Sequence, residues 1–75
     1  MFILLRMYQD DPLEALACSS DFDKLRKLYW EKVFQTAASI KEFYARIYCI
    51  ELTHKDALDK AQARYQLLFV PEVLQ

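Results

Sequence analysis

Glycine is absent from this chain of 75 residues, and so is asparagine. A two-residue hairpin turn usually places glycine or asparagine where the backbone needs a positive φ. The chain therefore lacks the residues that most often close a tight hairpin. The same absence excludes the glycine-rich loops of dinucleotide-binding and P-loop proteins. The lack of glycine and asparagine favours helices, and an antiparallel sheet would need other residues in its hairpin turns.

Length and composition together describe one small domain, residues 1–75, with no room for a second core. A chain of this size buries only roughly 60% of the surface that its unfolded form exposes, so its stability is marginal. Yet 55% of its residues are apolar and 15% are aromatic. Either the core is unusually dense, or part of this apolar surface faces another protein or a second copy of the chain.

Charge and cysteine content narrow the class of protein and the cellular compartment. Ten basic residues stand against eleven acidic ones, a balance that disfavours a general nucleic-acid binder. Cys18 and Cys49 show no Cys-x-x-Cys spacing, so we expect two buried thiols in a reducing cytoplasm, with one disulfide as the alternative. The apolar start is too short for a secretory signal, and no stretch approaches the roughly 20 apolar residues of a membrane span. We expect a soluble cytoplasmic protein.

The first third of the chain favours a hairpin. Residues 2–8 alternate as a strand, residues 9–12 read as a turn, and residues 13–19 follow as a second strand. A helix start is the alternative, with Asp11 as N-cap and Pro12 at the first helical position.

Helical patterns dominate the middle of the chain. Residues 20–35 predict a helix capped by Ser20, and residues 36–62 predict a second helical region. Within that region Ser39 repeats the capping pattern, and Thr53 opens a further helix.

Two segments leave helix and strand open. Residues 45–52 are rich in β-branched and aromatic residues, so a strand is an alternative there. Residues 65–70 continue a helical stripe, but Pro71 forces Val70 toward an extended conformation and favours a terminal strand.

Two architectures follow. We favour an α+β fold, in which a small antiparallel sheet made of the N-terminal hairpin and a late strand is packed by one or two amphipathic helices. The alternative is an all-helical bundle, which the capping patterns and the missing glycines support. The apolar start at residue 2 and the extended-looking end decide for the first.

A resemblance covers about the first 35 residues. An apolar run, a short turn and the stretch 15–21 (ALACSSD), which opens an amphipathic helix, resemble short open reading frames of bacteriophages and mobile elements. Such proteins often have a strand–strand–helix–strand plan. The resemblance implies an accessory protein that binds and modulates a host or viral protein, and it carries over no functional residue.

The residues that could support catalysis are few. His54 is the only histidine, and it stands near a predicted helix start, where an exposed surface position is the simpler interpretation. Cys18 and Cys49 show no spacing that predicts a nucleophile beside His54 or a zinc site. We therefore expect no enzyme and neither a cofactor nor a metal.

One aromatic pair stands apart on the first helix. At 100° per residue, Trp30 and Phe34 fall about 80–120° to one side of Phe22 and form their own ridge. Either another helix covers this ridge, or the ridge anchors a partner, since tryptophan and tyrosine dominate interface hot spots. Lys27 and Glu31 would form its polar rim. The candidate partner-binding residues are Trp30, Phe34, Lys27, Glu31 and Tyr8.

These observations favour a non-enzymatic protein-binding module, of the kind that a phage-type inhibitor or modulator of a host protein would be. A homodimer that buries the apolar excess against itself is one alternative. A nucleic-acid-binding accessory subunit is another, since Lys24, Arg26, Lys27 and Lys32 are interleaved with aromatic residues on the first helix. Membrane binding is not expected.

Overall fold

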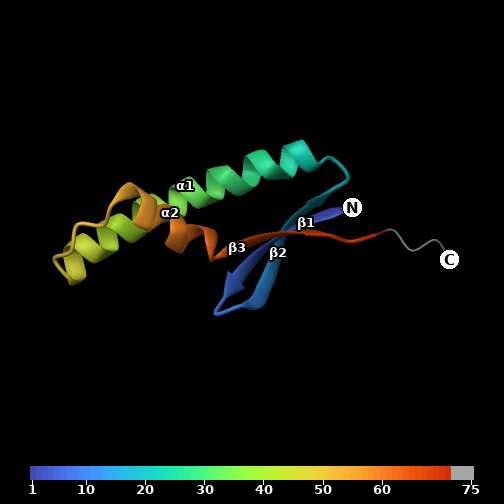
Figure 1. Ribbon diagram of the computed structural model, residues 1–75. Helices are drawn as coiled ribbons and strands as arrows, with labels where there is room; N and C mark the ends of the chain where they lie inside the picture. Colours follow the sequence, from blue (N-terminus) through green and yellow to red (C-terminus); the bar gives the residue numbers. More distant parts are fainter. Residues whose placement is uncertain (72–75) are drawn as a thin grey trace.

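The computed structural model describes residues 1–71 and has the α+β architecture that the sequence favours, so the all-helical alternative is wrong. Three antiparallel strands form one sheet in the order β2-β1-β3. Helix α1 crosses this sheet and extends beyond it, where α2 lies at its side (Figure 1). The elements are β1 (Phe2–Tyr8), β2 (Asp11–Ser19), α1 (Phe22–Ile47), α2 (His54–Gln62) and β3 (Tyr65–Phe69).

The hairpin between β1 and β2 turns on two residues that are neither glycine nor asparagine. Tyr8 pairs with Asp11, which leaves only Gln9 and Asp10 in the turn, with φ of 49° and 69°. A positive φ crowds the Cβ atom of an ordinary residue and costs on the order of 1 kcal/mol. The predicted turn over residues 9–12 is therefore too long. Asp11 belongs to β2, as the strand interpretation of this segment favoured, and the alternative of a helix start at Asp11 is wrong.

The strained turn makes a stability prediction. Replacing Gln9→Asn together with Asp10→Gly should raise the free energy of unfolding by about 1–2 kcal/mol, because both new residues accept a positive φ readily. Urea unfolding at one protein concentration measures the gain. Asp59→Gly within α2 is the matched control, and it should lower stability by about 1 kcal/mol. An unchanged midpoint in the turn variant would show that the turn carries no strain.

Helix α1 begins later and ends later than the sequence predicts. Asp21, not Ser20, is the N-cap, and its carboxylate accepts a hydrogen bond from the Lys24 N–H at 3.3 Å. The expected break after residue 35 does not occur. Ser39 donates its hydroxyl to the Gln35 carbonyl at 3.2 Å, so its side chain is satisfied inside the helix and does not start a new one.

The connection between the helices is short. Cys49 has a φ of 54°, and the Ile50 N–H donates to the Tyr44 carbonyl at 3.1 Å. Helices that end with a residue in this left-handed conformation usually have glycine there. The strand considered for residues 45–52 is therefore wrong.

The last two predicted elements are confirmed. Thr53 caps α2 and accepts from the Asp56 N–H at 3.1 Å. The late strand is β3, which pairs with β1 and carries the chain to Phe69, two residues before Pro71.

The core is small and lies mainly between the helices. Leu4 in β1 and Leu25 in α1 are buried, while the central cluster joins α1 to α2. Three of the five members of this cluster are alanines, which let the two helices approach closely. The cluster consists of Val33, Ala37, Ile40, Ala57 and Ala61.

The sheet has one covered face and one open face. Phe2 contacts Phe22 of α1, with ring centroids 5.0 Å apart, and Tyr65 reaches Thr36 of α1 with a 2.7 Å hydrogen bond between hydroxyls. Because side chains alternate along a strand, Ile3 and every second residue after it in β1 point to the other face. No other element between residues 1 and 71 packs on that open face.

The fold leaves much apolar surface exposed. Within residues 1–71, seven hydrophobic side chains are buried and thirteen large ones are exposed, so a dense core does not explain the composition. The cysteines follow the same trend. Cys18 and Cys49 are free and exposed, which corrects the expectation of buried thiols and excludes the disulfide.

Candidate docking surface

Trp30 and Phe34 form the predicted ridge on α1. Their ring centroids are 5.8 Å apart, and the rings are tilted by 32°. Tyr29 supports the ridge from below, because its ring meets Trp30 edge-on at 5.3 Å. Trp30 is 38% exposed and Phe34 is 52% exposed. The two rings therefore present one continuous aromatic surface to solvent.

Helix α2 does not cover this ridge. It packs against the side of α1 that carries Val33, Ala37 and Ile40, all of which are buried. Trp30 and Phe34 lie farther round the helix and stay outside that contact. Of the two interpretations that the sequence left open, cover by another helix does not hold for the residues that the structure describes.

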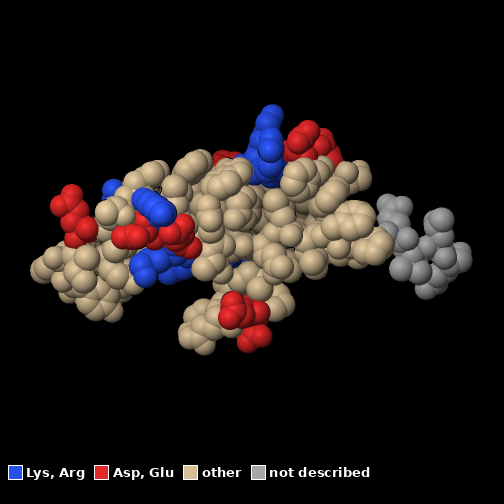
Figure 2. All heavy atoms as spheres, viewed as in Figure 1, with Lys and Arg blue, Asp and Glu red and all other residues tan. Residues whose placement is uncertain are grey.

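The proposed polar rim lies beside the ridge, toward β2. Lys27 and Glu31 are exposed and line a shallow hollow of about 390 Å³ with Cys18 of β2. They stand one helical turn apart, so two opposite charges lie along one side of the aromatic surface. Figure 2 shows acidic and basic side chains close together over the helices in this view, without a broad region of one sign.

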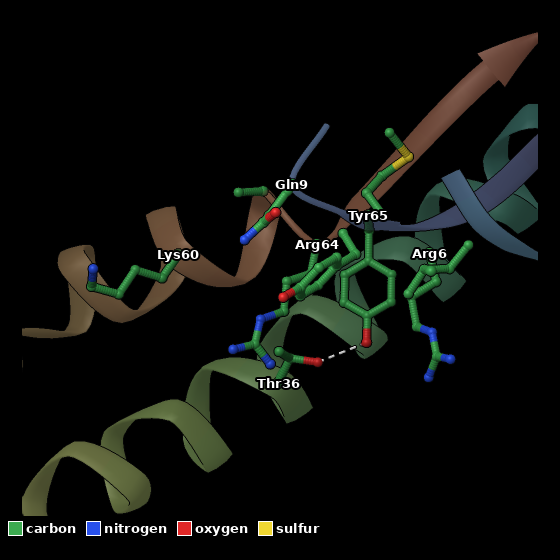
Figure 3. Close-up of a pocket in the computed structure, with 10 residues that line it drawn as sticks. Arg6, Gln9, Thr36, Lys60, Arg64 and Tyr65 are labelled. Atoms are coloured by element: carbon green, nitrogen blue, oxygen red, sulfur yellow. Dashed lines mark hydrogen bonds between the residues drawn. The ribbon is translucent and has the colours of Figure 1, made fainter. Parts of the chain in front are cut away.

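The structure places Tyr8 elsewhere. Tyr8 is 60% exposed and lines a hollow of about 500 Å³ at the hairpin end of the sheet, together with Thr36, Lys60 and Arg64. Figure 3 shows this hollow between α1, the end of α2 and the start of β3. Trp30 and Phe34 do not line it. Tyr8 therefore does not join the ridge as the sequence suggested.

Cations line the Tyr8 hollow, but most of them are already engaged. Arg6 forms a 3.1 Å ion pair with Glu14. The Lys60 Nζ lies 5.4 Å from the centre of the Tyr44 ring. Arg64 is the remaining cation of the lining. Within the described residues, only the charge of Arg6 among these cations is balanced by an acidic side chain, because a contact with an aromatic ring does not neutralise Lys60.

Sequence reasoning missed a second aromatic cluster, at the far end of α1. Phe43 meets Tyr44 and Tyr48 edge-on, with ring centroids 6.0 and 5.8 Å apart. Phe43, Ile47 and Tyr48 are all more than half exposed, because α1 extends past the sheet here. The helical spacing of Phe43, Tyr44 and Ile47 was the signal in the sequence, but spacing alone does not tell whether another element covers these residues.

Titratable groups form no dense arrangement in the described chain. Burial raises the pKa of the Tyr29 hydroxyl. His54 is exposed at the first turn of α2, as expected. Among residues 1–71, no three His, Cys, Asp or Glu side chains gather closely enough to hold a metal ion. Neither helix in that range combines the length and apolar character needed to cross a membrane.

The basic residues of α1 do not all share one face. At 100° per residue, Lys24 and Lys27 lie about 60° apart and line one hollow, but Arg26 points at least about 100° away from both. Nucleic-acid binders usually gather such residues into one stripe. Comparison of the chain with protein-family models, with curated proteins and with solved structures finds no match.

Proposed function

We propose that this protein is a non-enzymatic binding module that docks on another protein through Trp30 and Phe34. The uncovered ridge carries the proposal, because two adjacent aromatic rings remain 38% and 52% exposed on a helix whose other side is packed. Aromatic anchors beside a polar rim are typical of interface hot spots. Lys27 and Glu31 supply that rim.

Two observations support the class of partner and the compartment that we propose. The resemblance of the first 35 residues to phage and mobile-element accessory proteins favours a host or viral protein that the module modulates. The free, exposed thiols of Cys18 and Cys49 suit a reducing compartment, so we place the action in the cytoplasm. The scattered basic residues of α1 give nucleic acid less support than a protein partner.

Affinity capture from a lysate of the native host tests the proposal. The tagged wild type should retain one stoichiometric protein, and Trp30→Ala should lose it, because removal of a hot-spot anchor weakens binding about 30-fold or more. Trp30→Ala should keep the far-UV circular dichroism of the wild type. If it unfolds instead, Trp30 belongs to the core and the assigned site is wrong.

A matched control comes from the same helix. Phe43 is 51% exposed, close to the value for Phe34, and lies at the far end of α1. Phe43→Ala should leave capture intact, whereas Phe34→Ala should weaken it. Equal losses for the two variants would contradict a site centred on the ridge.

A further inference from the structure

The two edges of the sheet are built differently. Strand β2 carries Pro12, and its register with β1 shifts twice, between Leu4 and Leu5 and between Arg6 and Met7. Proline and bulges are the features by which proteins prevent an edge strand from pairing further. Strand β3 (Tyr65–Phe69) has no proline, no charged residue and an unbroken register with β1. Within residues 1–71 no further strand pairs with its outer edge, and β3 itself has none of these protections.

The hydrogen bonds to β1 show which backbone groups of β3 are unused by the sheet. Met1 and Val70 exchange both of their bonds, at 3.1 and 2.8 Å, so they form a hydrogen-bonded pair. Such pairs alternate along an antiparallel ladder. The N–H and C=O groups of Tyr65, Leu67 and Phe69 consequently point away from β1, toward the open edge.

We propose that β3 pairs with β3 of a second copy of this chain, antiparallel, about a twofold axis at Leu67. The two three-stranded sheets then join into one sheet of six strands. Each of the three outward residues finds a hydrogen-bonded partner in this register. Leu67 faces its own equivalent, and Tyr65 faces Phe69 of the second copy on both sides of the axis.

Two features make a second copy the fitting occupant. All five residues of β3 are uncharged, so the twofold arrangement brings no like charges together. It also sets an aromatic ring opposite an aromatic ring twice, which is a favourable cross-strand pair. Phe69 is 59% exposed in the single chain, and this pairing places the ring of Tyr65 beside it.

Pro71 fixes the register. It has the same parity as Leu67 and Phe69, so its nitrogen faces the open edge, and that nitrogen carries no hydrogen to donate. A shift of the register toward the C-terminus would place Pro71 in a hydrogen-bonded position and lose a bond. A shift the other way would leave Phe69 without a partner. The register centred on Leu67 therefore gives a hydrogen-bonded partner to the largest number of outward-facing residues.

The oligomeric state of the purified protein tests this pairing. The result does not depend on whether the docking proposal is correct. Sedimentation should be followed from about 1 to about 500 μM, since a short edge suggests moderate affinity. The expected result is a rise from the 9.0 kDa monomer to twice that mass. A monomer over the whole range overturns the proposal.

Leu67→Pro locates the interface. The Leu67 N–H bonds nothing in the sheet of the single chain, so proline there spares the pairing with β1 and removes the central donor of the dimer. We expect a monomer at every concentration with the far-UV spectrum of the wild type. A folded Leu67→Pro variant that still dimerises overturns the assignment to this edge.

A surface variant decides the matter if Leu67→Pro does not fold. Gln66 is exposed, and its equivalent in the second copy would lie diagonally across the axis. Gln66→Lys should weaken the dimer about three- to tenfold, and a mixture with Gln66→Glu should restore it. Gln35→Lys on α1 is the control and should change nothing. Equal dimerisation of Gln66→Lys and wild type overturns the proposal.

Discussion

Leu4→Ala should remove most of the protein's stability and leave a large fraction of the chain unfolded at 25 °C. Leu4 is fully buried on the central strand, where its side chain faces α1. Truncation of a buried leucine costs about 2–5 kcal/mol, because it removes apolar contacts and leaves a cavity. A domain of this size has a total stability of only about 3–5 kcal/mol. The loss and the total are therefore of similar size.

Urea unfolding monitored by far-UV circular dichroism measures the effect of Leu4→Ala, with all variants at one protein concentration because dimerisation would shift the midpoint. Leu13→Ala is the control, since the same substitution falls on a residue of the hairpin that is 56% exposed. It should cost less than about 1 kcal/mol. Equal midpoints for the two variants would contradict the core described here.

Ala57→Leu should destabilise the protein by about 1–3 kcal/mol or more. Ala57 is fully buried between α2 and α1, where Ala37 and Ala61 also keep the helices close. A leucine has no space there and must push the helices apart. Ala45→Leu makes the same change on an exposed position of α1 and should have little effect. Thermal unfolding compares the two, and equal melting temperatures would refute close packing at Ala57.

The strands could be predicted because each carries a local signal. The alternating pattern of residues 2–8 predicted β1, and Pro71 predicted where β3 ends. The hairpin turn is the exception, since the usual glycine or asparagine is missing and the chain accepts positive φ at Gln9 and Asp10. Pairing along two strands offsets this local strain. Turn propensity is a local property of the sequence and does not include the free energy of strand pairing.

The helices were harder to delimit because capping residues also occur inside helices. Ser39 matched a start pattern, yet its hydroxyl bonds the preceding turn and α1 continues to Ile47. The position of the ridge followed correctly from the angular spacing of Trp30 and Phe34. Its exposure depended on where α2 packs, and that is a tertiary contact without a local signature. The same limit explains the mistaken burial of Cys18.

The most direct test of the docking surface uses Trp30 itself, because it is the only tryptophan of the chain. The protein labelled with 5-fluorotryptophan gives a single ¹⁹F resonance that can be observed in a lysate of the native host without background. The account predicts that this resonance shifts or broadens when the ring leaves solvent for a partner, and that unlabelled wild type, but not unlabelled Phe34→Ala, reverses the change. An unchanged resonance in a lysate from which the tagged protein captures a partner would contradict docking through Trp30.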